Sequence, residues 1–569
     1  MWNFACPDWV ERLKAGRSLL PDLPLNQAEA ARAVGIFGKL HLPDVVGQPS
    51  LAIAGSGWQR DIVSAIFGSL SKDNKRMVRE AFVMIPKKNS KTTSGAAIML
   101  TALLMNVRPR AEFVLVGPTQ EVADGAFQQV VGMIDADPDD YLQKRFQVQE
   151  HLKTVIDRKN KAKLKIKTFD LKVATGSKPA GILLDELHQM SQYSYASRVV
   201  GQLRGGMLAN PEAFMITITT QSDDMPSGVF KSELNYAREV RNGVAVGDIR
   251  TLPMLYEFPE SMQIDDNRPW ADPKNWPMVM PNLGKPFTIA DLEAEYEVAK
   301  SKGEEEERRW ASQHLNVQIG LAMHDGRWRG ADYWLNAKDP EQITLDALLK
   351  RSEVVVVGGD GGGLDDLLGL AVLGRDKISK DWLLWCHGWA QSDVLEKRKE
   401  IAERLRDFER DGDLTILKAG ETTRDIKEFC DVIEKVHKSG LLPEKLGIGL
   451  DPYAVGSIID ELALREIYTE AHEPPGCVTG IRQGSALSPA TWGMERKLKD
   501  GTLWHAGSPL MAWCVGNAKA EQRGNAVLIT KQTAGKAKID PLVAAMNAVM
   551  LMSKNPVAAA NLQASLVIL

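Results

Sequence analysis

A lysine followed by two threonines closes a short polar turn that could bind the phosphates of a nucleotide: Lys91, Thr92 and Thr93. In phosphate-binding loops a lysine contacts the phosphate oxygens and a hydroxyl ligates Mg²⁺, while backbone N–H groups at a helix N-terminus hold the phosphates. The usual pattern is G-x-x-x-x-G-K-[ST], and here Ile85 and Ser90 stand at the two glycine positions. On this motif alone, a phosphate loop and an ordinary basic turn are both open.

An acidic pair, Asp185 and Glu186, follows the apolar run 180–184 and could complete such a site. An aspartate there orients Mg²⁺ through water, and a glutamate polarises the water that attacks the γ-phosphate. Asp-Glu pairs are common by chance, but this one lies downstream of the lysine turn with another apolar run between them. The polar residues at 219–221, which end the next apolar run, suit a segment that senses the γ-phosphate.

Gln59 precedes the lysine turn by about thirty residues and opens a segment with apolar residues at helical spacing. Many nucleic-acid motor ATPases place an adenine-reading amide at this distance from the phosphate loop. A surface glutamine at a helix start is the simpler interpretation, and the residue alone does not decide between them.

Three aspartates in the second half of the chain stand at the end of an apolar run or at the start of a helix: Asp360, Asp451 and Asp540. Mg²⁺ and Mn²⁺ need oxygen ligands on rigid elements, and two such ions can clamp the attacking and leaving oxygens of a phosphodiester. Alternatively, these carboxylates close a glycine turn and an Asp-Pro turn and cap a helix. Both interpretations stay open at this point.

The elements that must position these groups alternate between strands and helices. Apolar runs at 82–85, 111–117, 180–184 and 213–218 predict a parallel α/β sheet, with its ligands at the carboxyl ends of the strands. Runs at 353–360, 367–373 and 382–386 predict a second sheet that begins with a hairpin. Prolines crowd between 250 and 345, where a single charged helix is expected at 289–310.

Composition sets the protein class. A chain of 569 residues is too long to fold around a single hydrophobic core, so we expect several domains. A content of 44% hydrophobic and 25% charged residues is typical of a globular protein. A net charge of −4 means that any nucleic-acid surface must be local. Five scattered cysteines without a C-x-x-C pair favour a reducing compartment. Asp8 and Glu11 interrupt the N-terminal apolar residues, so we expect no signal peptide and a cytoplasmic protein.

Taken in order, these stretches resemble the large subunit of tailed-phage terminases, the motor that pumps viral DNA into a procapsid, over roughly residues 50 to 555. Residues 86–92 read Pro-Lys-Lys-Asn-Ser-Lys-Thr and are similar to the family's own unusual P-loop, commonly Pro-Arg-Lys-Asn-Gly-Lys-Ser/Thr. Residues 57–59, 183–188 and 219–221 resemble its adenine-side, Walker B and coupling motifs. Asp360 with Asp366, residues 449–453 and residues 538–540 resemble the acids of its nuclease.

The resemblance implies an α/β fold with an N-terminal P-loop ATPase domain, whose mainly parallel sheet is flanked by helices, and a C-terminal RNase H-like nuclease domain. The expected boundaries are 1–50 for an N-terminal appendage, 51–250 for the ATPase, 251–345 for a linker with a small helical region, and 346–569 for the nuclease. The implied ATP-binding residues are Gln59, Lys87, Lys88, Asn89, Ser90, Lys91, Thr92, Thr93 and Asp185.

Further roles follow from the same resemblance. Glu186 would activate water, Thr92 and Asp185 would hold Mg²⁺, and Thr219, Thr220 and Gln221 would couple hydrolysis to DNA movement. The nuclease would use Mg²⁺ or Mn²⁺ held by Asp360, Asp366, Asp451 and Asp540. Implied partners are double-stranded DNA, a small terminase subunit, a portal protein and further copies in a ring, with Arg198 or Arg204 as arginine finger.

Two departures from the family pattern are expected to lower the rate of ATP turnover. Ser90 replaces the loop glycine, and Lys87 replaces an arginine, so that a point charge stands where a planar fork is usual. Two alternatives are a prophage remnant with decayed centres that only binds DNA or portal, and a helicase fused to a nuclease. The intact Lys-Thr, Asp-Glu and three acids argue against the first, and the lack of convincing helicase motifs after Thr220 argues against the second.

Overall fold

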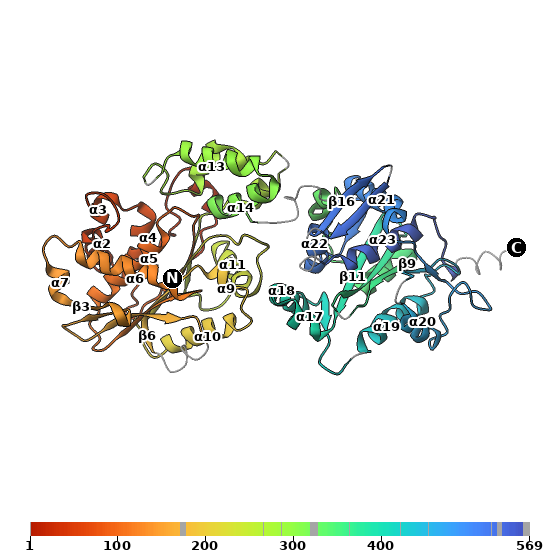
Figure 1. The fold of residues 1–569 in the computed structure, drawn as a ribbon, viewed down its shortest axis with the longest axis horizontal. Helices are drawn as coiled ribbons and strands as arrows, with labels where there is room; N and C mark the ends of the chain where they lie inside the picture. Colours follow the sequence, from red (N-terminus) through yellow and green to blue (C-terminus); the bar gives the residue numbers. More distant parts are fainter. Residues whose placement is uncertain are drawn as a thin grey trace. The chain divides into compact units, whose positions relative to one another are not determined.

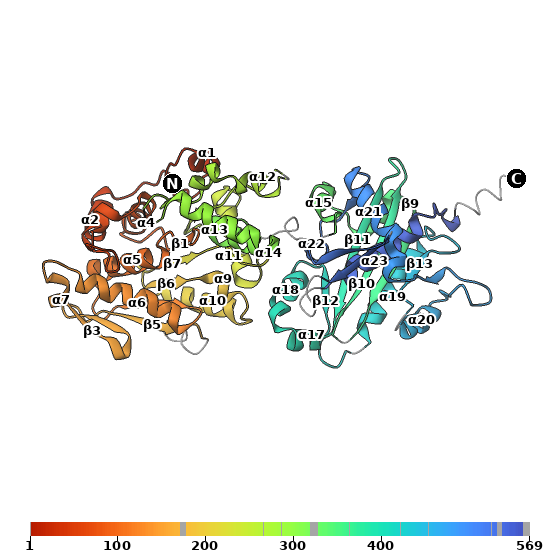
Figure 2. The same ribbon diagram turned by 45° about the horizontal axis from the view of Figure 1, so that its top comes forward.

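The computed structural model describes residues 2–170, 178–265, 267–285, 287–318, 328–363, 365–421, 423–452, 455–524, 526–531 and 538–560. The chain divides into two units, residues 1–319 and 320–569. Each unit is a sheet flanked by helices (Figures 1 and 2). None of the helices formed by the described residues has both the length and the apolar character needed to cross a bilayer.

The first unit is built on an eight-stranded sheet in the order β3-β4-β5-β2-β6-β7-β1-β8. The six strands from β5 to β8 run parallel, and β4 and β3 extend the sheet in antiparallel pairing. The predicted parallel α/β sheet is therefore confirmed. The strands are β1 (Glu80–Met84), β2 (Glu112–Gly117), β3 (Phe146–Gln149), β4 (Thr154–Asp157), β5 (Lys163–Thr168), β6 (Pro179–Asp185), β7 (Phe214–Thr219) and β8 (Thr251–Leu255).

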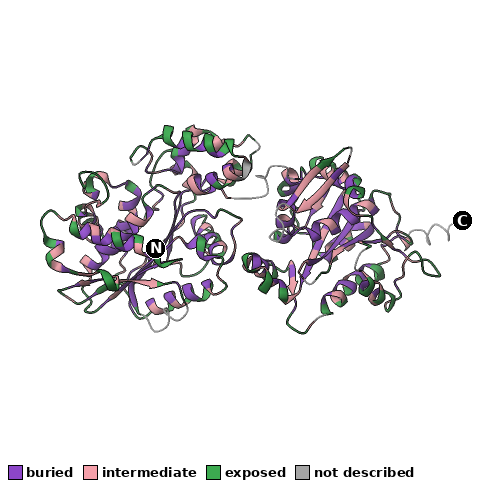
Figure 3. Cartoon of the chain, viewed as in Figure 1, coloured by how far each residue is buried: buried purple, intermediate pink, exposed green. Residues whose placement is uncertain are grey.

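Helices bury the faces of this sheet, as a parallel sheet requires, and Figure 3 shows the buried strands inside the helical layers. The helix after β1 is itself largely buried, from Ser94 to Leu103. Helix α2 packs on the helices α4 and α5, so part of the predicted N-terminal appendage belongs to the first unit. The helices are α1 (Trp9–Lys14), α2 (Gln27–Lys39), α3 (Leu51–Ala54), α4 (Gly57–Gly68), α5 (Lys91–Met105), α6 (Gln120–Asp135), α7 (Tyr141–Arg145), α9 (Leu187–Met190), α10 (Ala196–Met207), α11 (Gly228–Arg241) and α12 (Glu260–Ile264).

The prediction of a single charged helix at 289–310 is wrong. Two helices cover this region, α13 (Ile289–Ser301) and α14 (Glu304–Leu315). The chain breaks between them at Gly303, whose φ of 109° is a conformation that residues with a side chain rarely adopt. Charged residues lie on both sides of this glycine, so the composition of the segment does not mark the break.

The second unit contains a sheet in the order β12-β11-β10-β9-β13-β14, with β15 also paired to β11. Strands β11, β10 and β9 are antiparallel, and β13 and β14 continue the sheet parallel to β9. Three antiparallel strands continued by two parallel ones form the expected RNase H-like arrangement, which is confirmed. The strands are β9 (Ser352–Gly361), β10 (Leu367–Asp376), β11 (Trp382–Ala390), β12 (Leu414–Ile416), β13 (Ile448–Leu450), β14 (Val478–Gly480) and β15 (Leu503–His505).

Helix α23 (Asp540–Met552) lies across β9 and β10, and two glycines permit this close approach. A Cβ on Gly358 would lie 2.0 Å from the backbone oxygen of Ala544, and one on Gly369 would lie 2.6 Å from the nitrogen of Pro541. The first residue of α23 is thereby held against the sheet. The other elements are α15 (Ala331–Trp334), α16 (Leu345–Arg351), α17 (Ser392–Lys397), α18 (Lys399–Arg410), α19 (Arg424–Lys438), α20 (Gly456–Ala463), α21 (Ser488–Lys499), α22 (Pro509–Gly516) and the hairpin of β16 (Ala518–Arg523) and β17 (Ala526–Lys531).

Candidate active sites

The polar turn between β1 and α5 has two residues in the left-handed region of backbone conformation. Lys88 has a φ of 67°, and Ser90 has a φ of 54° and a ψ of 38°. Glycine reaches this region without strain, whereas an L-residue pays roughly 1–2 kcal/mol there. The geometry thus accounts for the glycine that the family pattern places at position 90, and it shows that serine adopts the same loop conformation.

The lysine turn and the acidic pair meet at the carboxyl edge of the sheet. The Oγ1 of Thr92 donates a hydrogen bond to Oδ2 of Asp185 at 2.9 Å. The Nζ of Lys91, in a side chain only 6% exposed, lies 3.9 Å from Oε1 of Glu186. The order β6-β7-β1 accounts for the meeting, because the carboxyl ends of parallel strands lie on one edge.

Asp185 fits a role in holding a divalent cation together with Thr92. Its Oδ1 is buried and has no hydrogen-bond partner among the described residues. Burial, followed by the charge of Glu186, raises the pKa of Asp185 to about 7. A cation at this carboxylate would supply the missing partner and favour the ionised form. In the described part of the chain no three His, Cys, Asp or Glu side chains enclose an ion unaided, so phosphate oxygens and water would complete the shell.

Glu186 occupies a constrained position next to the phosphate loop. Its φ of 54° is in the left-handed region, immediately before α9. Its Oε2 lies 3.2 Å from Nδ1 of His188. Burial tends to raise the pKa of Glu186, but His188 and the charge of Lys91 outweigh burial and lower the pKa. The carboxylate therefore stays ionised near neutral pH, which is the state that can accept a proton from water.

His188 connects Glu186 to two of the residues predicted to couple hydrolysis to movement. Its backbone N–H donates to Oγ1 of Thr219 at 3.1 Å, and its ring Nδ1 lies 3.1 Å from that oxygen and 3.4 Å from Oγ1 of Thr220. Gln221 has other partners: its backbone N–H donates to Oδ1 of Asn316, and its Oε1 accepts from the backbone N–H of Ser222. The sequence motif contained His188, but we assigned it no role, because nothing in its spacing shows which side chain it meets.

Gln59 lies beside the phosphate loop with both ends of its amide engaged. Its Oε1 accepts from the backbone N–H of Ser56 at 2.6 Å, which caps α4. Its Nε2 donates to Oγ of Ser94 at 2.6 Å, and that hydroxyl donates to the backbone oxygen of Ser90. In this arrangement Gln59 supports the loop, and its contact with adenine stays a prediction.

Asn282 is a loop-organising residue that sequence reasoning missed. Its backbone N–H and its Nδ2 donate to Oδ1 and to the backbone oxygen of Asn89, both at 3.0 Å. Its Oδ1 accepts from Oγ of Ser56 and from the indole of Trp58. A lone asparagine in a proline-rich stretch carries no signal of such distant contacts.

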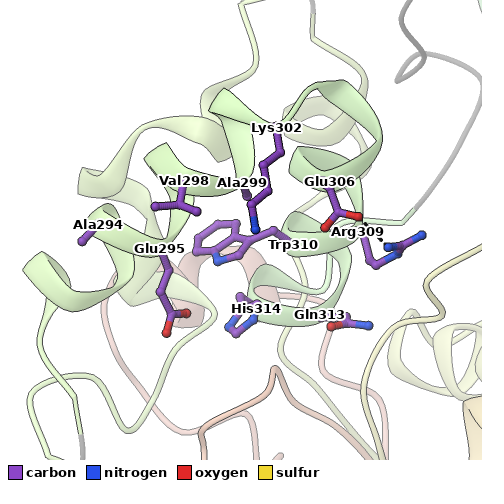
Figure 4. Close-up of a pocket in the computed structure, with 10 residues that line it drawn as sticks. All are labelled: Ala294, Glu295, Val298, Ala299, Lys302, Glu306, Arg309, Trp310, Gln313 and His314. Atoms are coloured by element: carbon purple, nitrogen blue, oxygen red, sulfur yellow. Dashed lines mark hydrogen bonds and ion pairs between the residues drawn. The ribbon is translucent and has the colours of Figure 1, made fainter.

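The two lysines at the start of the loop point to the α13–α14 pair. Lys87 donates from its backbone N–H and from Nζ to the backbone and side-chain oxygens of Gln313, at 2.8 and 2.7 Å. Lys88 forms an ion pair with Glu295 on α13. Beside them is a pocket of about 440 Å³, where Trp310 stacks on His314 and Glu295 lies alongside (Figure 4). Thr93, the remaining predicted loop residue, is half-buried in the first turn of α5.

The predicted nuclease acids converge at the ends of β9 and β13 and the start of α23. The pKa of Asp360 is raised well above its ordinary value, first by burial and then by the charges of Asp540 and Asp451. Burial and Asp366 raise the pKa of Asp540 to about 7, and its Oδ2 is buried without a hydrogen-bond partner among the described residues. Tyr453, the last residue of the predicted motif 449–453, lies outside the described residues.

Two lysines lie among these acids, and sequence reasoning gave neither a role. The Nζ of Lys531 is 2.8 Å from Oδ2 of Asp366 and 3.6 Å from Oδ1 of Asp540. The Nζ of Lys538 is 2.9 Å from Oδ1 of Asp366 and also contacts the backbone oxygen of Asp365. Carboxylates are the ligands that divalent cations need, and the buried Oδ2 of Asp540 has no hydrogen-bond partner among the described residues. These acids therefore fit such ions, although in the described part of the chain no three of them enclose an ion unaided.

The two arginine-finger candidates differ in how they are engaged. Arg204 forms ion pairs with Glu80 at 2.7 Å and with Glu233 at 2.5 Å, so its guanidinium is held by carboxylates of its own unit. Arg198 is exposed on α10. Of the two, only Arg198 presents its side chain at the surface in a way that suits contact with a neighbouring subunit.

Comparison with known proteins gives two family matches that together cover most of the chain. Residues 57–239 match the family described as "Terminase large subunit, ATPase domain", and residues 256–555 match "Terminase large subunit, endonuclease domain". Protein YmfN of Escherichia coli (strain K12) is 21% identical over 384 residues, which are 66% of this chain and 77% of that protein.

Solved structures similar to this chain include two phage terminases, at low identity. The HK97 bacteriophage large terminase is 17% identical with a TM-score of 0.44, over 91% of this chain and 99% of that one. The large terminase of a thermophilic bacteriophage, in complex with ATP-gamma-S, is 12% identical with a TM-score of 0.32, over 87% of this chain and 99% of that one.

Proposed function

The chain belongs to the terminase large subunit family, and we propose that Lys91, Asp185 and Glu186 form its ATP-hydrolysing centre. Members of this family are ATPases and endonucleases that package and cleave phage DNA, and this chain has both domains. We assign DNA cleavage to Asp360, Asp451 and Asp540. The observation that carries the proposal is the meeting of Thr92 with Asp185, at 2.9 Å, on the edge of the sheet where Lys91 approaches Glu186.

In the proposed hydrolysis, the backbone N–H groups of the loop and Lys91 bind the phosphates. Thr92 and Asp185 would hold Mg²⁺, which supplies charge neutralisation at the phosphate oxygens. Glu186 orients water towards the γ-phosphate and accepts its proton, a role supported by its lowered pKa. Thr219 and Thr220, at the end of the adjacent strand, pass the state of this centre to the following loop.

In the proposed cleavage, Asp360, Asp451 and Asp540 would hold Mg²⁺ or Mn²⁺, with Asp366 as a fourth carboxylate. Bound ions would stabilise the charge that develops on the attacking and leaving oxygens of the phosphodiester. The helix start at Asp540 and the strand end at Asp360 hold their carboxylates on rigid elements. Affinity for DNA should fall steeply with salt, because the contacts would be mainly to phosphates.

The proposed partners are double-stranded DNA, a small terminase subunit, a portal protein and further copies in a ring, with Arg198 as the arginine finger. We further propose that the protein acts in the host cytoplasm, where ATP and newly made DNA are found. The proposed divisions are 1–50, 51–250, 251–345 and 346–569 for appendage, ATPase, linker and nuclease. The helicase alternative is not favoured, since both family matches are to terminase domains. The remnant alternative is not favoured because the Lys-Thr, the Asp-Glu pair and the three nuclease acids are all present.

The experiment is plasmid cleavage and ATP turnover measured on the same preparation of the full chain, with Mg²⁺ or Mn²⁺, comparing wild type with Asp451→Asn. The variant should lose cleavage and retain ATP turnover, because Asp451 belongs to the second unit alone. Asp460→Asn, an exposed position on α20, is the matched control. Cleavage by Asp451→Asn at the wild-type rate would overturn the assignment of the nuclease site.

A further inference from the structure

We propose that His188 is a positioning residue that holds Glu186 in register with the coupling segment, Thr219 and Thr220, through a hydrogen atom on Nδ1. The proposal rests on the hydrolytic role proposed for Glu186 and extends it. The side chain of His188 is only 7% exposed, and its Nδ1 lies 3.2 Å from Oε2 of Glu186. No other residue among those described brings a ring nitrogen to both Glu186 and Thr219.

The hydrogen-bond pattern assigns the tautomer. The hydroxyl of Thr219 donates to the backbone oxygen of Thr220 at 3.1 Å, so its hydrogen is already used. Its oxygen accepts from the backbone N–H of His188 and lies 3.1 Å from the ring Nδ1. The two oxygens nearest to Nδ1 are therefore a carboxylate oxygen of Glu186 at 3.2 Å and the hydroxyl oxygen of Thr219, whose hydrogen is directed to the backbone. Both are acceptors, and the hydroxyl of Thr220 is further away at 3.4 Å, so the contacts favour a hydrogen on Nδ1.

The ring is held in place by packing as well as by polar contacts. It meets Phe230 of α11 edge to face, with centroids 6.3 Å apart and an interplanar angle of 69°. Helix α11 begins soon after the coupling segment, and Thr220 Oγ1 is 3.4 Å from the same Nδ1. A shift of Glu186 during hydrolysis would therefore reach Thr219, Thr220 and α11 through one side chain.

Glu186 combines an unfavourable backbone conformation with a side chain that has few polar partners. Its backbone is in the left-handed region, at a φ of 54°, and its buried Oε2 faces Nδ1 of His188 at 3.2 Å and no other donor among the described residues. Without His188 the carboxylate would keep the charge contact of its Oε1 with Lys91, at 3.9 Å, and lose the contact of its Oε2. A misplacement of about 1 Å in a catalytic group can cost on the order of 100-fold in rate.

Two isosteric replacements separate the hydrogen on Nδ1 from the bulk of the ring. Asparagine places its amide nitrogen where histidine has Nδ1, whereas glutamine places its amide nitrogen near the position of Nε2. The full chain would be measured for steady-state ATP turnover with and without double-stranded DNA, for wild type, His188→Asn, His188→Gln and His188→Ala. Thermal unfolding of each variant would report on folding.

We expect His188→Ala and His188→Gln to lower kcat by about 10-fold or more with KM for ATP unchanged, because the phosphate loop is intact. His188→Asn should stay within about 3-fold of wild type and keep its stimulation by DNA. An equal loss of kcat in all three variants would show that only the packing of the ring matters, and it would overturn the proposal. Wild-type values of kcat in all three variants would overturn it as well. Failure of the underlying function would look different, since Glu186→Gln would then turn over ATP normally.

Discussion

Thr92 and Asp185 are 93 positions apart in the chain, yet Oγ1 of the threonine donates a hydrogen bond to Oδ2 of the aspartate at 2.9 Å. The contact joins the start of α5 to the end of β6, and it places Lys91 and Glu186 on either side of the same space. The proposed ATPase centre is built around this contact. The acids of the proposed nuclease centre also lie on rigid elements, since Asp360 lies at the end of β9 and Asp540 begins α23, which packs across β9.

Replacement of Ser90 tests the backbone conformation of the phosphate loop. Ser90→Val should lower kcat/KM for ATP by about 10-fold and reduce the melting temperature, because a β-branched residue is strained at a φ of 54°. Ser90→Gly should keep or raise turnover, since glycine adopts this conformation freely. Steady-state ATPase assays with both variants measure the effect. A valine variant as active as the glycine variant would contradict the loop geometry.

Replacement of Lys531 tests whether its ammonium group competes with metal ions for Asp366 and Asp540. Lys531→Met should tighten Mn²⁺ binding in the absence of DNA by about 10-fold, because the carboxylates lose a cation at 2.8 and 3.6 Å. Titration calorimetry gives the affinity, and Lys519→Met on the same hairpin is the control. Weaker Mn²⁺ binding by the Lys531 variant would show that the lysine supports the site instead of competing for it.

The pH dependence of stability tests the buried carboxyl group of Asp540. Its pKa is raised from 3.8 to about 7 by burial and Asp366. Between these values the folded protein binds more protons than the unfolded chain, so this group's contribution to stability falls as pH rises. Metal-free Asp540→Asn should therefore gain melting temperature relative to wild type at pH 7.5 but little at pH 5. A gain that is the same at both pH values would contradict the raised pKa.

Replacement of Gly358 tests the packing of α23 against the sheet of the second unit. A Cβ at this position would lie 2.0 Å from the backbone oxygen of Ala544, so Gly358→Ala should destabilise the second unit by about 1–3 kcal/mol and reduce cleavage. ATP turnover should persist, since the residue lies in the second unit. Gly456→Ala is the matched control, because nothing lies within 4 Å of a Cβ there. Full cleavage and unchanged unfolding in the Gly358 variant would contradict the packing.

Much of the fold, and the approach of Lys91 to Glu186 at one edge of the sheet, could be predicted because local patterns determine them. Apolar runs such as 111–117 are buried strands, and polar residues at the ends of parallel strands must share an edge of the sheet. The contacts of Asn282 with Asn89 and of Gln313 with Lys87 join residues 193 and 226 positions apart. Tertiary packing alone creates such contacts, and no periodicity or spacing in the sequence reveals them.

The break at Gly303 and the position of Lys531 are further features that sequence patterns do not reveal. Gly303 adopts a φ of 109°, but an isolated glycine in a charged helix is often tolerated, so its presence did not predict a break. Lys531 ends the strand β17 (Ala526–Lys531), and a lysine on an edge strand is usually solvated. Only the approach of that strand to Asp366 gives it chemical importance.

The most direct test of the account is ATP turnover by Glu186→Gln with nucleotide binding measured on the same sample. The amide keeps the shape of the side chain but removes the carboxylate that would accept a proton from water. We expect turnover to fall by about 100-fold or more, with binding of ATP within about 3-fold of wild type. Turnover at the wild-type rate would contradict the assignment of Glu186, and with it the proposed ATPase centre.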